Sequence, residues 1–196
     1  MSVLLRIRNI FVKPRDEWQV IKEEKTTYGD QITGYCALIS AIPPIAAVLE
    51  RFIFNRGVVS NVVQSPFGYV IATNVLWYLV IVANVIITGV IITAIISRKE
   101  PGWAGLPGLQ LASYSYTPLF LVGILIIIPR LSWLIYPAIL YSLYLLSLGI
   151  RTMTGLPQRK AAAYAVVSFL VAGAIVGVLN GMEYMLESFL ANKVFF

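Results

Sequence analysis

The stretch TPLFLVGILIIIPRLSWLIYPAILYSLYLLSLGI, residues 117–150, decides the fold, and its only charged side chain is Arg130. Two apolar runs of 20 residues, Leu109–Ile128 and Leu131–Ile150, lie on either side of Pro129 and Arg130. About 20 apolar residues in a helix cross the roughly 30 Å of hydrocarbon in a bilayer. Proline ends a helix because it lacks an N–H and clashes with the preceding turn. The stretch therefore predicts a hairpin of two membrane helices with Arg130 at the water interface.

The composition also indicates a membrane protein. Of the 196 residues, 59% are hydrophobic and only 12% are charged, and the mean hydropathy is +0.82. Soluble globular domains typically carry about 25% charged residues, and a water-soluble fold of this size could not hide so much apolar surface. The composition therefore excludes an ordinary soluble domain.

Three further apolar segments are long enough to span a bilayer. They are Ile32–Leu49, Tyr69–Ser97 and Ala161–Met182. Together with the hairpin they make five crossings. We therefore predict an all-α membrane protein with five transmembrane helices, preceded by amphipathic helices on the cytoplasmic side.

The distribution of basic residues predicts the orientation. Five crossings place the termini on opposite sides, and cytoplasmic loops are richer in Lys and Arg. With the N-terminus in the cytoplasm, eleven of the fifteen basic residues are cytoplasmic, namely Arg6, Arg8, Lys13, Arg15, Lys22, Lys25, Arg98, Lys99, Arg151, Arg159 and Lys160. The other four are Arg51, Arg56, Arg130 and Lys193. This predicts a cytoplasmic N-terminus and a C-terminus on the opposite side, with anionic headgroups as partners at the cytoplasmic face and no nucleic-acid partner.

The first thirty residues differ from the rest of the chain. Apolar and basic side chains alternate in SVLLRIRNIFV, which favours a short helix lying in the headgroup plane. Pro14 suits the first position of a second helix. Two interpretations stay open, a pair of helices on the membrane surface and a docking surface for a cytoplasmic partner. The chain thus divides into a cytoplasmic amphipathic segment (1–30), a five-helix transmembrane domain (31–190) and a short tail (191–196).

Prolines interrupt three of the predicted spans. Pro43 and Pro44 leave two carbonyls of the first span without helical donors, and Pro118 and Pro137 interrupt the third and fourth spans in the same way. Unsatisfied carbonyls in hydrocarbon are costly, so neighbouring helices, hydroxyls or water must satisfy them. Each position is either a packing kink or a hinge with a polar niche for a lipid.

Polar and small residues mark two helix faces. Thr73, Asn84 and Thr88 share one side of the second span, either for hydrogen bonds between helices or as a groove for a substrate. In the last span, Gly173, Gly177 and Gly181 follow a four-residue spacing, which permits close helix contact. That contact is made either within the bundle or with a second copy of the chain.

Residues for catalysis are scarce. The chain has no histidine and one cysteine, Cys36, so His-based acid–base chemistry, His metal ligands and thiolate clusters are excluded. Every lysine lies outside the predicted spans. Glu183 and Glu187 lie one turn apart near the end of the last span, where solvated charges are expected. We therefore expect a protein that is not an enzyme and uses no cofactor or metal.

Several segments, in order, resemble one family. They are NIFVKPRDEWQVIKEE (9–24), YCALISAIPPIAAV (35–48), SYSYTPLFLVGILIIIPRL (113–131) and YSLYLLSLGI (141–150). The most specific positions are Pro14 and Trp18, the Tyr116-Thr117-Pro118 run, and Tyr141, Tyr144 and Gly149. In order and spacing they resemble the Yip1 family, and in particular its bacterial inner-membrane members.

The resemblance implies a five-helix, integral inner (plasma) membrane protein with a cytoplasmic N-terminus. Eukaryotic members of the family are tied to vesicle traffic and to prenylated Rab GTPases. This chain lacks their long N-terminal region and their Asp-Leu-Tyr-Gly-Pro stretch, so Rab binding is not carried over. The resemblance thus implies a fold more firmly than a function.

Two functions are compatible with these residues. The first is a non-enzymatic membrane protein that organises lipids or an unknown protein partner, with a homo-oligomer through the last helix. The second is a small transporter or lipid-handling carrier with a passage between the kinked helices. The residues predicted to contact lipid or partner are Trp18, Pro43, Pro44, Asn84, Thr88, Tyr116, Pro118, Tyr141 and Tyr144, and those predicted for helix packing are Gly173, Gly177 and Gly181.

Overall fold

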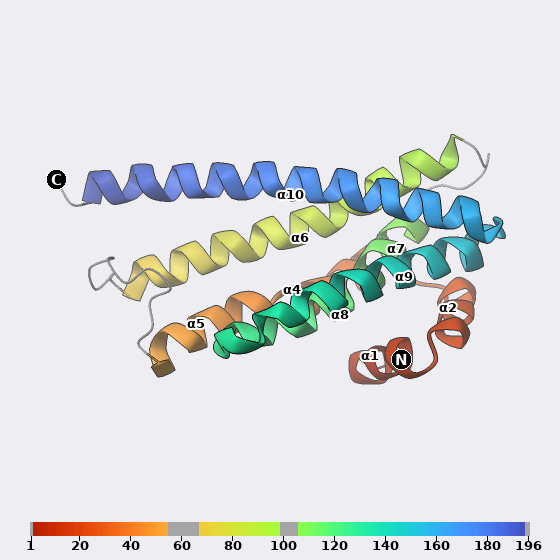
Figure 1. Cartoon of the computed structure of the whole chain (residues 1–196), viewed down its shortest axis with the longest axis horizontal. Coiled ribbons are helices and arrows are strands. Elements are labelled where there is room, and N and C mark those ends of the chain that lie inside the picture. The colour runs from red at the N-terminus through yellow and green to blue at the C-terminus, as the bar shows by residue number, and fades with distance from the viewer. Residues whose placement is uncertain (1, 55–66, 99–105, 195–196) are drawn as a thin grey trace.

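The computed structural model describes residues 2–54, 67–98 and 106–194. Every regular element in these three ranges is a helix and none is a strand, which confirms the predicted all-α class. Figure 1 shows the long helices running along the longest axis of the molecule, with the N-terminal helices α1 and α2 at one end.

Four helical segments in the described residues are long and apolar enough to cross a membrane. They are Tyr28–Arg51, Val70–Ser97, Pro107–Ile127 and Arg130–Thr154, and they correspond to the first four predicted spans. The fifth predicted span, Ala161–Met182, lies within α10 (Gln158–Val194), a single helix of 37 residues that is not among the four. The count of five crossings therefore stays a prediction.

The first span is broken at its two prolines. Its segments are α3 (Tyr28–Gln31), the π-helix η1 (Ile32–Cys36), α4 (Ala37–Ser40) and α5 (Ile42–Phe54). Pro43 and Pro44 lie in the first turn of α5, where a missing N–H leaves no intrahelical bond unmade. The α-helical pattern resumes as Ile45 N donates to Ala41 O at 3.1 Å. The prolines therefore begin a new helix after the break, whereas the second span, α6 (Phe67–Ser97), is one continuous helix.

The predicted hairpin between the third and fourth spans is present. It consists of α7 (Leu106–Ser115), α8 (Thr117–Val122), the 3₁₀ helices η2 (Gly123–Ile127) and η3 (Pro129–Leu134), and α9 (Ile135–Thr154). The chain reverses at Ile128, whose backbone leaves the helical region (φ −123°, ψ 85°) just before Pro129. Arg130 is exposed at this turn. At the other end of α9, Gly155 adopts φ +73°, a left-handed conformation that favours glycine, and the chain turns into α10.

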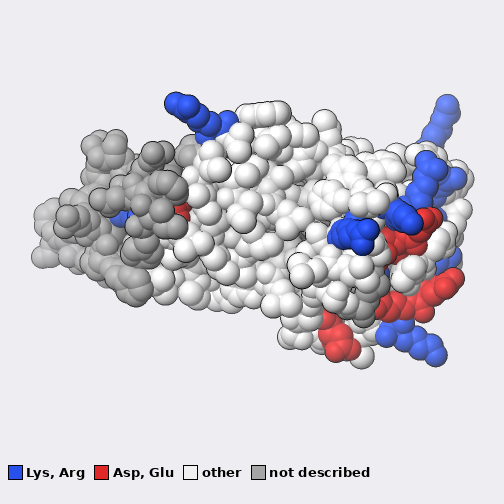
Figure 2. Space-filling view, turned by 90° about the horizontal axis from the view of Figure 1, so that it is seen from below, with Lys and Arg blue, Asp and Glu red and all other residues white. Residues whose placement is uncertain are grey.

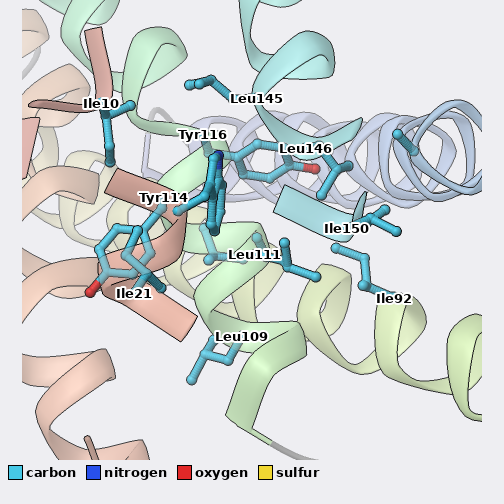
Figure 3. Packing of buried hydrophobic residues seen from close by; sticks show 14 of the residues in the cluster. Ile10, Ile21, Ile92, Leu109, Leu111, Tyr114, Tyr116, Leu145, Leu146 and Ile150 are labelled. Atoms are coloured by element: carbon cyan, nitrogen blue, oxygen red, sulfur yellow. The ribbon is translucent and has the colours of Figure 1, made fainter. Parts of the chain in front are cut away.

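Helices α1 (Val3–Val12) and α2 (Pro14–Glu23) pack against the bundle. Pro14 begins α2, as predicted. Ile10, Trp18 and Ile21 are each 1% exposed and belong to one core cluster with buried residues of α7 and α9 (Figure 3). The N-terminal pair therefore directs part of its apolar surface into the protein, which the alternation of apolar and basic residues did not reveal.

Glycine permits the closest approach of α6 to α7. A Cβ on Gly89 of α6 would lie 2.8 Å from the Leu109 Cα of α7, and a Cβ on Gly108 would overlap the Thr93 side chain and the Gly89 carbonyl. Small residues let helix backbones approach closely in a membrane. The crossing of these two helices therefore depends on both glycines.

We expect Gly108→Ala to destabilise the protein, because the added methyl group overlaps backbone atoms of α6 and overpacking typically costs about 1–3 kcal/mol. Gly34→Ala is the matched control, since a Cβ on Gly34 meets nothing within 4 Å and alanine favours a helix over glycine. Thermal unfolding of the full-length chain in detergent measures both effects. If Gly108→Ala unfolds at the wild-type temperature, the close α6–α7 crossing is contradicted.

Candidate functional site

A buried ion-pair cluster fastens α1 to α2. Arg6, 4% exposed, donates to Glu17 Oε1 at 2.6 Å and also pairs with Glu24. Asn9 Nδ2 donates to Glu17 Oε2 at 2.9 Å, and the Arg6 guanidinium lies 5.3 Å from the ring centroid of Tyr114. Because an uncompensated buried charge is costly, the cluster holds α1 in one position. Its members are spread over two helices and the segment after them, so no local pattern in the sequence reveals it.

Other side chains of the N-terminal pair are exposed and form a platform of apolar and basic groups. Leu4 and Val12 are 79% and 64% exposed, and Arg8, Lys13 and Arg15 are exposed beside them along the chain. Figure 2 shows that charged side chains of the visible face gather mainly at one end of the molecule, beyond a broad uncharged band. This platform of Leu4, Arg8, Val12, Lys13 and Arg15 is chemically suited to anionic headgroups.

A layer of buried hydrogen bonds joins the first span to the third. Gln31 Nε2 donates to Ser113 Oγ at 2.6 Å, and Tyr114 Oη donates to Gln31 Oε1 at 3.1 Å. The hydroxyls of Tyr35 and Thr117 are 2.7 Å apart. Buried polar groups in a membrane require such partners. Hydrogen bonds between residues about 80 positions apart leave no pattern in the sequence. The sequence therefore did not predict this layer.

The structure brings together three of the predicted contact residues, Asn84, Thr88 and Tyr116. Thr88 Oγ1 donates to Asn84 O at 2.8 Å and lies 3.3 Å from Tyr116 Oη. The ring of Tyr116 packs edge-on against Phe120 and Phe169, with centroids 6.1 and 5.8 Å away. The predicted polar face of α6 therefore meets the third span here, as the interpretation of hydrogen bonding between helices expects.

Asn84 and Tyr116 border a cavity of about 550 Å³ between α5, α6, α10 and the hairpin. Four of the predicted residues line it, namely Pro43, Asn84, Tyr116 and Gly173. Most of the wall is aliphatic or aromatic, and none of the lining side chains is charged. The cavity therefore suits an apolar occupant better than a hydrated one.

A second cavity, of about 480 Å³, lies where the hairpin meets α1 and is lined by Phe11, Pro118 and Tyr141 among others. Tyr141 Oη donates to Ile10 O at 3.1 Å, and its ring stacks on Phe11 with centroids 5.4 Å apart. Tyr144 lies next to Tyr141, at 5.8 Å between ring centroids. Tyr141 of the fourth span thus contacts the N-terminal helix, and Tyr144 packs beside it.

The remaining predicted residues occupy different places. Trp18 is buried against Gly149, where a Cβ would lie 2.7 Å from Trp18 Cζ2. This burial corrects the expectation that Trp18 contacts lipid or a partner, because its ring holds α2 on the bundle. Pro44 lines a smaller cavity of about 340 Å³ with Asn74.

The glycines of α10 make no close contact within the described chain. A Cβ on Gly173, Gly177 or Gly181 would meet nothing within 4 Å. This corrects the interpretation of close packing inside the bundle and leaves contact with a second copy as a prediction. Among the described residues no group of three or more His, Cys, Asp or Glu side chains could hold a metal ion.

We expect Glu17→Gln to loosen the N-terminal pair, because it removes a charge that pairs with the buried guanidinium of Arg6 and breaking such a pair is destabilising by up to about 3–5 kcal/mol. Trypsin should then cleave the full-length, detergent-solubilised protein faster after Arg8, which is exposed and followed by Asn9. Asp16→Asn, at an exposed neighbouring position, is the control and should cleave at the wild-type rate. Equal rates for all three proteins would show that the ion pair does not hold the helices.

Comparison with known proteins agrees with the resemblance noted from the sequence. The family model described as Yip1 domain matches residues 8–179. The chain is 28% identical over 184 residues to "Inner membrane protein YohC" of Escherichia coli strain K12, covering 90% of this chain and 93% of that protein. The same figures hold for YohC of Escherichia coli O6:H1 strain CFT073. No solved structure matches the chain significantly. Because the family model covers most of its length, this multi-pass membrane protein belongs to the Yip1 domain family.

Proposed function

We propose that the protein is a non-enzymatic, multi-pass protein of an inner membrane that organises lipids or protein partners, with its N-terminus in the cytoplasm. The main support for this proposal is the platform on α1 and α2. Buried Arg6 and Trp18 hold the two helices on the bundle, while exposed apolar and basic groups remain available. A fixed surface of this kind suits recruitment of anionic lipid or of a partner at the membrane surface.

The proposed orientation draws on charge and on the course of the helices. The turn from α9 to α10, with exposed Arg151, Arg159 and Lys160, lies at the same end of the molecule as α2 (Figure 1). Basic residues are concentrated on the cytoplasmic side of membrane proteins. At 1.5 Å per residue, the 37 residues of α10 are long enough for a fifth crossing, which would place the C-terminus on the opposite side.

The proposal also includes self-association of the protein. The open glycine face of α10, with Gly173, Gly177 and Gly181, supports self-association, because small residues permit close helix contact.

The alternative of a carrier for polar solutes requires a hydrated path at mid-membrane. Thr73 and Thr88 both donate to carbonyls of their own helix, and the cavity beside Asn84 has mainly apolar walls. These features favour lipid over polar solute.

We expect the combined substitution R8E/K13E/R15E to reduce the share of anionic lipid around the protein, because each basic residue near an anionic surface contributes about 1 kcal/mol of attraction. Mass spectrometry of lipids in polymer-bounded discs cut directly from the membrane measures this share.

The control is Arg130→Glu, which reverses an exposed charge at the hairpin turn. It should leave the share of anionic lipid unchanged. The proposed lipid-organising surface is wrong if the triple variant retains the wild-type share while remaining folded by circular dichroism.

A further inference from the structure

The cavity of about 550 Å³ has features that a general organising role does not explain. Its volume falls within the roughly 300–1,000 Å³ typical of small-molecule sites. Trp77, Phe120 and Phe169 place aromatic rings on its wall beside Tyr116, and the residues that line it carry no charge. Seven elements contribute residues to its lining, namely α5, α6, α8, η2, η3, α9 and α10. Such walls suit a neutral and largely apolar molecule.

Asn84 lines this wall and carries a buried polar atom that has no partner in the described part of the chain. Its side chain is 7% exposed, and Nδ2 has no hydrogen-bond acceptor among the described residues. Asn84 lies 14 residues from Val70 and 13 from Ser97, the ends of its span, so at 1.5 Å per residue it is about 20 Å from either end. Buried water needs two to four polar partners, and this mainly apolar wall offers few. Rotation about the last side-chain bond would turn the amide toward the cavity, where an oxygen atom on a bound molecule would satisfy it.

Gly173 keeps the opposite side of the cavity open. It lines the cavity from α10, and a Cβ on it would meet nothing within 4 Å. Gly123 has another role, since its missing side chain lets Pro43 approach, with a Cβ position only 2.6 Å from Pro43 Cγ. The α5–η2 contact is therefore tight while the space facing Gly173 stays empty of side chains.

We propose that this cavity binds one molecule of a neutral, long-chain lipid whose carbonyl or hydroxyl oxygen accepts a hydrogen bond from Asn84 Nδ2. The hydrocarbon part lies against the aromatic wall. A phospholipid headgroup is excluded, because a charge at mid-membrane depth is costly and the wall has no basic side chain. The inference rests on the proposed function, since it names one class of the lipids to be organised.

Two kinds of membrane lipid carry this chemistry, and direct binding distinguishes them. Acylglycerols present ester carbonyls and a hydroxyl, whereas isoprenoid quinones present ring carbonyls. The full-length protein in detergent is tested with tritiated dioleoylglycerol and with a tritiated long-chain isoprenoid quinone, with unlabelled squalane as an oxygen-free competitor. We expect saturable binding of one probe, which identifies the source, and no displacement by squalane at equal concentration.

Matched variants locate the site. Asn84→Leu should weaken binding about three- to tenfold, the value of one hydrogen bond. Asn74→Leu is its control, because Asn74 lies on the same helix and donates instead to Val70 O at 2.8 Å. Gly173→Leu should abolish binding by filling the cavity, whereas Gly177→Leu, on the same helix but outside the wall, should bind as wild type does.

Several results would overturn the proposal. They are the absence of saturable binding of either probe, displacement by squalane as effective as by the unlabelled probe, and wild-type binding by both Asn84→Leu and Gly173→Leu. Gly173→Leu keeps the test valid if Asn84→Leu fails to fold, since its side chain enters open space. The R8E/K13E/R15E protein should bind the probe normally, so the cavity and the N-terminal platform can fail independently.

Discussion

Hydrocarbon surrounds the membrane spans of this chain, so each polar group buried within them needs a partner inside the protein. The hydrogen-bond layer between the first and third spans meets that need, and through it Gln31 fixes the hydroxyl of Tyr114. The Tyr114 ring then supports the N-terminal helices. Trp18 packs edge-on against it at 6.2 Å between centroids, and the Arg6 guanidinium lies over it. The position of the platform on α1 and α2 therefore depends on a polar layer inside the bundle.

The breaks in the first and third spans determine where the bundle is tight and where it is open. The chain starts a new helix at the prolines of α5, and the third span narrows into 3₁₀ geometry at η2. Pro43 fits against Gly123 where these two elements meet. The cavity beside Asn84 opens next to this contact, between α6, α10 and the part of the hairpin from α8 to α9. Side-chain hydrogen bonds and helix breaks thus produce both a rigid support and an unfilled volume.

The platform and the cavity are both chemically suited to lipid, and they lie at different depths. The platform combines exposed apolar and basic side chains, as interfacial helices do. The cavity is uncharged and lined by aromatic rings, and Asn84 on its wall lies about 20 Å from either end of the α6 span at 1.5 Å per residue. Membership of the Yip1 domain family is compatible with both, because a family relation establishes the architecture and leaves the function to the sites.

The sequence by itself determined the elements that depend on local order. Hydrophobic length predicted the first four spans, Pro129 predicted the hairpin turn, and Pro14 predicted the start of α2. Only the tertiary structure decided which side chains meet. It buried Trp18 against Gly149, paired Arg6 with Glu17, and left the α10 glycines open. The physical reason is that a bilayer selects helices by length and apolarity, which are properties of consecutive residues, whereas packing and hydrogen bonds join residues that are distant along the chain.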